Sequence, residues 1–395
     1  MPFYALWSSP ACLLVLQSVA VASGAWPVFR LVEGKSSDAW LGAGYAGVYL
    51  LYPPLQAANL FDFHDMTLVA PILAWAWYAA MRGRWWVWGL LAAAAAGFRE
   101  EAALTLFALG VLLLFQSATR RAGVWTMVGA ATWLALVVLV IPWGAINRSD
   151  LLPRLGWGNS LGGVVINIVS HPAQVMAMVL QPEKVRYLCH LFAPVGYLFF
   201  LSPAMLLPIL PTLTIYLLSA WPAVTSPAQF HYNAPFSVFI VLAAAEGSAR
   251  LSAFLARRTR FSQRFLLHLL LGYVLALSLG YQTKLSHLPY SPHFQWPEVT
   301  THHRLGEVIA QQIPPEASVS AQNPLAPHVS HRHTLYVFPF VGDAEYVFLD
   351  LTVPGTLRAD GADQIEIEQR IQELLADPQY ITVVQQDGYV LLRRR

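Results

Sequence analysis

Long apolar runs alternate with short polar breaks from residue 11 to residue 281. A helix needs about 20 mostly apolar residues to cross a bilayer. On that scale the pattern predicts an all-α, polytopic transmembrane bundle of about ten helices over residues 1–282. These helices are expected near residues 11–29, 39–58, 66–81, 85–97, 102–116, 124–145, 187–201, 204–219, 234–255 and 265–281. Two alternatives stay open: 85–97 and 102–116 as one kinked helix, and 187–219 as a hairpin broken around Pro203.

Residues 162–181 carry a different apolar pattern. Val164, Val165, Ile168, Val169, Val175, Met176 and Val179 recur near the helical period, with small and polar residues between them. An amphipathic helix of this kind lies in the membrane interface. We therefore expect an interfacial helix near 162–181.

Charged residues and histidines return after residue 282, and helix and strand patterns alternate. Helices are predicted over 301–312 and 363–376, and strands over 317–321, 335–338, 346–349, 380–385 and 389–392. Asp387-Gly388, between the last two strands, is a strong hairpin signal. The sequence thus predicts a small soluble α/β domain over residues 283–395.

Composition agrees with a membrane protein. The chain is 56% hydrophobic and 12% charged, with a mean hydropathy of +0.49, whereas a soluble domain is about 25% charged. The net charge of +2 argues against nucleic acid as a partner. Cys12 and Cys189 lie in apolar runs and are expected to be buried thiols. No Walker or dinucleotide motif is present, so ATP-driven transport by this chain alone is not expected.

Basic residues suggest an orientation, because short cytoplasmic loops are rich in Lys and Arg. If the spans alternate, one side receives Arg30, Lys35, Arg82, Arg84, Arg120, Arg121, Arg257, Arg258, Arg260 and Arg264. That side is predicted to be cytoplasmic in a bacterial inner (plasma) membrane, which places the C-terminal domain outside the cytoplasm. No basic residue precedes Arg30, so no cleaved signal peptide is predicted. The chain would then start outside, close to its first span, and we expect Met1 to be a shortened start.

Three polar clusters fall on the opposite, external face in this topology: residues 59–65, 99–101 and 231–233. In the first, Asp62 and His64 stand two residues apart, a spacing that directs both side chains to one side of an extended turn. Such a pair can share proton transfer or ligate a divalent cation. No third ligand is apparent, so no metal site is predicted. Asp65 is expected to cap the next helix.

The second cluster, Arg99-Glu100-Glu101, lies between strongly apolar runs. A charge at membrane depth costs about 2.5–3.5 kcal/mol, which favours a functional explanation. Either these residues form an internally paired helix turn at the interface, or Arg99 binds a phosphate and a glutamate orients it or acts as a base. In the third cluster, His231 is a candidate ligand group and Tyr232 is typical of an interfacial anchor. The histidines at 302, 303, 331 and 333 are interpreted as solvated.

Several strings in the chain resemble a bacterial membrane family catalogued as domain of unknown function 2079. They are residues 54–64, Phe98-Arg99-Glu100-Glu101, His231-Tyr232 and residues 319–328. That family in turn resembles the GT-C superfamily of polytopic glycosyltransferases, which use polyprenyl-phosphate-linked sugars. GT-C enzymes carry a catalytic acid in their first external loop, and no residue here matches it.

The resemblance implies a membrane glycosyltransferase that takes its sugar from a polyprenyl-phosphate donor at the external face. Asp62, Glu100 or Glu101 would then be the base, Arg99 would hold the phosphate, and His64, His231 and Tyr232 would line the site. Two alternatives remain: a transporter or flippase, and a non-catalytic membrane scaffold. The sequence identifies no cofactor.

Overall fold

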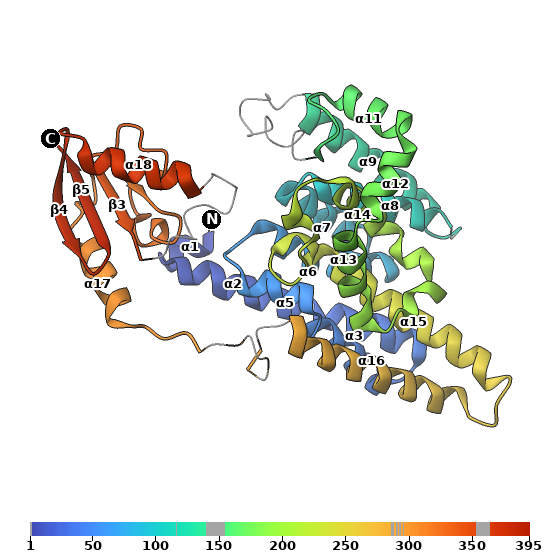
Figure 1. The fold of residues 1–395 in the computed structure, drawn as a ribbon. Coiled ribbons are helices and arrows are strands. Elements are labelled where there is room, and N and C mark those ends of the chain that lie inside the picture. The colour runs from blue at the N-terminus through green and yellow to red at the C-terminus, as the bar shows by residue number, and fades with distance from the viewer. Residues whose placement is uncertain are drawn as a thin grey trace. The chain divides into compact units, whose positions relative to one another are not determined.

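A computed structural model describes residues 2–115, 117–139, 155–285, 288–289, 291, 294, 296–352 and 364–395. The chain divides into two compact units, residues 1–295 and residues 296–395. We call them the membrane unit and the C-terminal unit and describe each by itself (Figure 1).

Helices make up the described part of the membrane unit. They are α1 (Pro2–Leu6), α2 (Pro10–Ser23), α3 (Ala25–Ser36), α4 (Ala39–Leu50), α5 (Pro53–Leu60), α6 (Asp65–Met81), α7 (Trp85–Phe98), α8 (Glu101–Leu114), α9 (Arg120–Leu139), α11 (Leu161–Ser170), α12 (Pro172–Val179), α13 (Pro182–Phe192), α14 (Leu210–Leu218), α15 (Ser237–Ala256) and α16 (Gln263–Leu285). Short 3-10 segments join some of them: η2 (Ala193–Val195), η3 (Leu198–Leu201), η4 (Pro203–Ile209), η5 (Pro222–Thr225) and η6 (His231–Phe236).

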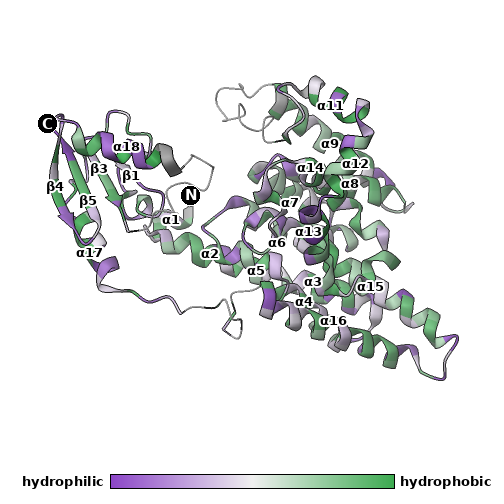
Figure 2. Ribbon diagram, viewed as in Figure 1, coloured by the Kyte–Doolittle hydropathy of each residue, from purple (hydrophilic) through white to green (hydrophobic). Residues whose placement is uncertain are grey.

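Within the described residues, three helical stretches are long and apolar enough to cross a membrane. They are Pro10–Ser36, His231–Ala256 and Gln263–Leu285. Apolar residues also dominate the shorter helices Trp85–Phe98, Glu101–Leu114 and Pro203–Leu218 (Figure 2). The prediction of a helical membrane protein is confirmed at this level, and the count of about ten spans stays a prediction.

Proline and glycine break several of the predicted helices. The helix expected over 39–58 is divided into α4 and α5, because Pro53-Pro54 can begin a helix but cannot continue one. A single helix over 187–201 is wrong: α13 ends at Phe192, and Gly196 and Tyr197 take left-handed backbone angles. The interfacial helix is also not continuous, since α11 and α12 meet at 90° before Pro172. Residues 140–145 of the span expected at 124–145 lie outside the described residues.

Helix α15 is the core of the membrane unit. Its residues Val238–Ala244 are at most 5% exposed. Gly247, one turn later, allows the backbone of η3 to approach: a Cβ there would lie 1.9 Å from the Leu198 carbonyl oxygen. The tyrosines Tyr45, Tyr49 and Tyr52 pack into the same core with 2% exposure or less.

The C-terminal unit is a five-stranded mixed sheet with helices on both faces. Its strands are β1 (Val319–Ala321), β2 (Leu335–Val337), β3 (Tyr346–Asp350), β4 (Tyr380–Gln386) and β5 (Tyr389–Arg394), in the order β2-β1-β3-β5-β4. Strands β1, β2 and β3 are parallel, while β5 pairs antiparallel with β3 and β4. Helix α17 (Thr301–Ala310) and η7 (Ala326–Val329) pack on one face, and α18 (Gln364–Ala376) packs on the other. The predicted small C-terminal sheet is confirmed; Asp363, the expected first residue of α18, lies outside the described residues.

Candidate functional site

A polar side chain from α2 fixes the loop that joins α5 to α6. Gln17 is fully buried, and its Nε2 donates hydrogen bonds of 3.3 Å to the carbonyl oxygens of Ala58 and Asn59. Its Oε1 accepts a 3.0 Å hydrogen bond from the backbone N–H of His64. One buried amide thereby satisfies two carbonyls in the last turn of α5 and one N–H of the loop, and sets the position of His64.

Two imidazoles from distant parts of the chain stack in this region. The ring centroids of His64 and His231 lie 3.8 Å apart with a 20° interplanar angle. The Phe61 ring borders both, at 5.2 and 5.4 Å. His231 begins η6 and is 4% exposed, and its Nδ1 has no hydrogen-bond partner within the described part of the chain. A buried polar atom without a partner costs roughly 1–3 kcal/mol, so this nitrogen favours a ligand that supplies one.

Arg99 and Glu101 face each other where the chain passes from α7 to α8. Arg99 Nη2 lies 3.9 Å from Glu101 Oε2, and the hydroxyl of Tyr216 lies 3.5 Å from the same carboxylate oxygen. Arg99 Nε is also buried without a hydrogen-bond partner among the residues described. The guanidinium interacts electrostatically with Asp65 as well as with Glu101.

The three loops therefore contribute to one site. His231 interacts electrostatically with both His64 and Arg99, and Arg99 interacts in turn with Asp65 and Glu100. A guanidinium, carboxylates and two imidazoles are thus gathered from segments far apart in sequence.

Asp62 does not join this group. Its side chain is exposed, and only its backbone carbonyl oxygen contacts His64, at 3.1 Å from Nδ1. Among the described residues, its carboxylate makes no hydrogen bond or ion pair. The cap expected from Asp65 is also wrong: the extended backbone ends at His64, which takes the N-cap position, and Asp65 is already in the first turn of α6.

Glu100 and Tyr232 lie at the edge of the site. Glu100 takes the N-cap position of α8 without a side-chain capping bond and is half-buried. The Tyr232 ring packs edge-on against Tyr216 and Trp221, at 6.4 and 5.2 Å between centroids, and its carbonyl oxygen lies 3.4 Å from the Tyr216 hydroxyl. Tyr232 therefore supports the backbone next to His231.

Sequence reasoning missed the residues that position these groups. Lys184 is 5% exposed, and its Nζ donates to the carbonyl oxygens of Tyr216 and Ser219 at 3.1 and 2.7 Å. The Tyr187 hydroxyl donates to Asn233 Oδ1 at 2.7 Å, which fixes the segment that follows His231. Lys184 and Gln17 could have been noticed in the sequence, because each is a polar residue next to or within an apolar run. Polar residues seldom occur in such places without a role.

The site has a group that can bind an anion and a group that can accept a proton. Arginine binds phosphate oxygens through its planar fork, and a nearby carboxylate can take a proton. Within the described residues, no group of three or more His, Cys, Asp or Glu side chains is placed to hold a metal ion.

Comparison with known proteins gives one family. The family model described as "Predicted membrane protein (DUF2079)" matches residues 1–391, which confirms the resemblance noted in the sequence. No curated protein matches the chain.

Proposed function

The chain belongs to the DUF2079 family of predicted membrane proteins, and on that premise we propose that it is a membrane glycosyltransferase. It takes a sugar from a polyprenyl-phosphate donor and transfers it to a hydroxyl acceptor at the external membrane face. The observation that carries the proposal is the pairing of Arg99 with Glu101, together with the stacking of His64 on the buried His231.

The reaction needs a cation for the leaving phosphate and a base for the acceptor. The acceptor oxygen attacks the anomeric carbon, the bond from that carbon to the phosphate oxygen breaks, and the acceptor proton passes to a carboxylate. Negative charge grows on the departing lipid phosphate. A guanidinium placed there in advance stabilises that charge in the transition state.

Two buried nitrogens support phosphate binding at this position. Arg99 Nε and His231 Nδ1 both lack a hydrogen-bond partner within the described residues. Phosphate oxygens would accept from Arg99 and, depending on the tautomer, from His231, which removes the cost of leaving these atoms unpaired. His64 holds the His231 ring in place by stacking against it.

Glu101 is the favoured base among the candidate carboxylates. It lies 3.9 Å from Arg99 and is 25% exposed, so it would stand beside a phosphate bound by Arg99 and remain accessible to an acceptor. Asp62 is exposed and separate from the group, and Glu100 lies at its edge.

Turnover of a labelled polyprenyl-phosphate sugar by the purified protein in proteoliposomes tests the assignment. Glu101→Gln should reduce turnover by about 10²–10⁴-fold, the usual contribution of a general base. Arg99→Ala should reduce it by about 10²–10³-fold, the effect of removing one charge-stabilising group. His231→Ala should also lower it.

Asp62→Asn is the matched control, because it removes a carboxylate from the same face without touching the Arg99 group. We expect it to retain turnover within about threefold, since its loss leaves the catalytic groups intact. If Asp62→Asn loses activity while Glu101→Gln keeps it, Asp62 and not Glu101 is the general base. Equal turnover in all variants would end the proposal.

A transporter or flippase is the second candidate, and one observation favours it. Glu246 lies within the apolar stretch His231–Ala256 and pairs with Lys35, and charge pairs of this kind line transport pathways. The same proteoliposomes distinguish the two functions, because a flippase moves the labelled lipid between leaflets without releasing polyprenyl phosphate.

A further inference from the structure

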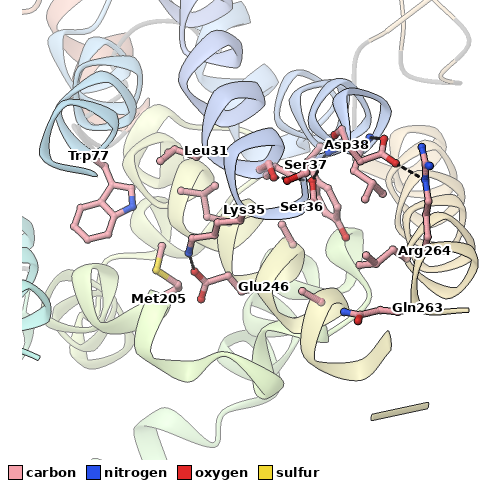
Figure 3. Close-up of a pocket in the computed structure, with 17 residues that line it drawn as sticks. Leu31, Lys35, Ser36, Ser37, Asp38, Trp77, Met205, Glu246, Gln263 and Arg264 are labelled. Atoms are coloured by element: carbon pink, nitrogen blue, oxygen red, sulfur yellow. Dashed lines mark hydrogen bonds and ion pairs between the residues drawn. The ribbon is translucent and has the colours of Figure 1, made fainter. Parts of the chain in front are cut away.

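A second site lies in the membrane unit, built from groups that take no part in the one described above. A cavity of about 500 Å³ opens between α3, α4, α15 and α16 (Figure 3). Its volume is typical of small-molecule pockets. Two ion pairs, Lys35–Glu246 and Asp38–Arg264, stand at separate places on its lining, and apolar residues make up most of the rest.

The carboxylates of this cavity are already engaged. Glu246 pairs with Lys35 through one oxygen and accepts a 2.7 Å hydrogen bond from the Ser202 hydroxyl through the other. Asp38 is 5% exposed; its Oδ1 accepts from two backbone N–H groups at the start of α4, and its Oδ2 lies 3.0 Å from Arg264 Nε. Their strong acceptor positions are occupied within the protein.

The cations keep unused donors. Lys35 donates one N–H to Glu246, and Arg264 donates its Nε–H to Asp38. Two ammonium protons and the guanidinium Nη groups therefore make no hydrogen bond to the described residues. The side chains of Lys35 and Arg264 are 62% and 76% exposed. The spare hydrogen-bonding capacity is therefore cationic and donor-only, which is complementary to an anion.

Besides the polar residues Ser36, Ser37 and Gln263, the remaining lining is apolar, and most of it comes from helices long enough to cross a membrane. Leu31 comes from Pro10–Ser36, Leu242 from His231–Ala256 and Leu267 from Gln263–Leu285, and Trp77 adds an aromatic ring. An occupant must therefore bring an alkyl chain as well as an anion. The turn between α15 and α16 adds three more arginines, at positions 257, 258 and 260, to the positive charge of this end.

We propose that this cavity binds an anionic phospholipid. Its phosphate is held by Lys35 and Arg264, and an acyl chain lies against Leu31, Leu242 and Leu267. Basic pockets between membrane helices are a recurrent way to recognise anionic headgroups.

Native mass spectrometry of the purified protein with phosphatidylglycerol, and with phosphatidylcholine of the same chains, tests this site. We expect tighter binding of phosphatidylglycerol, with a loss of about tenfold in Arg264→Gln and in Lys35→Gln, because each removes one charge-assisted hydrogen bond. Arg82→Gln is the matched control: Arg82 is exposed, the charge change is the same, and the residue does not line the cavity. It should bind like the wild type.

Leu267→Trp keeps every charge and fills the apolar wall, so it should also weaken binding. If Arg264→Gln fails to fold because Asp38 loses its partner, phosphatidylglycerol binding by Lys35→Gln and Leu267→Trp still tests the proposal. Equal binding of the two lipids, equal loss in Arg82→Gln, or displacement of phosphatidylglycerol by millimolar inorganic phosphate alone would overturn the proposal. The last result would identify a free-anion site.

Discussion

At the scale of single residues, buried polar side chains organise the membrane unit. Gln17 is the clearest case, since one amide serves two carbonyls in the last turn of α5 and one N–H of the loop that carries His64. Removing a partner from a buried backbone group costs more than the hydrogen bond itself contributed. The position of His64, and therefore its stack on His231, depends on a residue 47 positions earlier.

Gln17→Leu should destabilise the protein by about 2–4 kcal/mol, because the backbone groups of Asn59 and His64 lose their partner and the Ala58 carbonyl keeps only its bond from Thr67. Thermal unfolding of the detergent-solubilised protein measures this. Gln174→Leu, at an exposed position of α12, is the control and should change stability by less than about 0.5 kcal/mol. Equal melting temperatures for both variants would contradict the role given to Gln17.

His302 shows the same principle in the C-terminal unit. Its Nε2 lies 3.0 Å from Asp350 Oδ2 and its Nδ1 lies 2.8 Å from Asp387 Oδ2, while its ring stacks on Tyr389 at 4.3 Å. The hydrogen bonds to Asp350 and Asp387 raise the pKa of His302. Burial alone would raise the pKa of Asp350, but hydrogen bonds from Thr352 and His302 outweigh it and lower that pKa. His302 lies on the partly exposed face of α17, as expected, but the expectation did not include its two carboxylate partners, because the hairpin turn at Asp387 brings the second one to the ring.

Stability of the first turn of α17 should depend on pH. Because the folded pKa of His302 is raised, its interactions with Asp350 and Asp387 contribute their full stabilisation below the unfolded pKa of about 6.5. That stabilisation is lost as pH rises through the folded pKa. Hydrogen exchange of α17 in the full chain, corrected for intrinsic rates, should show greater protection at pH 6 than at pH 8.5. His302→Gln should abolish the difference, and the exposed His328→Gln should preserve it. The same difference in both variants would show that His302 is not the source of the pH-dependent stability.

At the scale of elements, close backbone approach sets how α15 packs. The Leu198 carbonyl of η3 occupies the space where any side chain at position 247 would begin. Gly272 of α16 offers the opposite case, since nothing lies within 4 Å of a Cβ there. The two glycines stand in comparable apolar helices and differ only in what surrounds them.

Gly247→Ala should destabilise the protein by about 3 kcal/mol or more, because helix α15 and η3 must separate. Gly272→Ala should instead raise stability by about 0.5–1 kcal/mol, the usual gain from replacing a helical glycine. Chemical denaturation followed by tryptophan fluorescence reports both. A neutral Gly247→Ala would mean that the two elements are not in contact.

Sequence patterns predicted the elements well where the period was clear and poorly where proline intervened. The strands of the C-terminal unit, the hairpin at Asp387-Gly388 and the helices α6, α15 and α16 followed from period and turn chemistry. The breaks at Pro53 and Pro172 and the irregular stretch 193–201 did not, because apolar residues continue through them and hydropathy cannot distinguish a bent segment from a straight one.

At the scale of the whole molecule, the candidate site is assembled from three segments, of which the one at His231 is more than 100 residues from the other two. The sequence indicated the loops that hold His64, Arg99 and His231, because polar clusters interrupt apolar runs there. It could not tell that the Asp62 carboxylate stays exposed while Asp65 interacts electrostatically with Arg99, since that depends on where the chain enters α6. The roles of Tyr216 and Lys184 could not be predicted for a similar reason: they arise from contacts between helices, although Lys184 stands out as a charge next to an apolar run.

The meeting of these loops is the claim on which the proposed function depends. Cysteines at positions 64 and 231, in a chain whose Cys12 and Cys189 are replaced by Ala, should be joined by a short bifunctional thiol reagent in native membranes. Cysteines at positions 35 and 246, which replace the Lys35–Glu246 ion pair, serve as the positive control. We predict efficient crosslinking of both pairs, detected as linked peptides by mass spectrometry. Crosslinking of 35 to 246 with none between 64 and 231 would contradict the account.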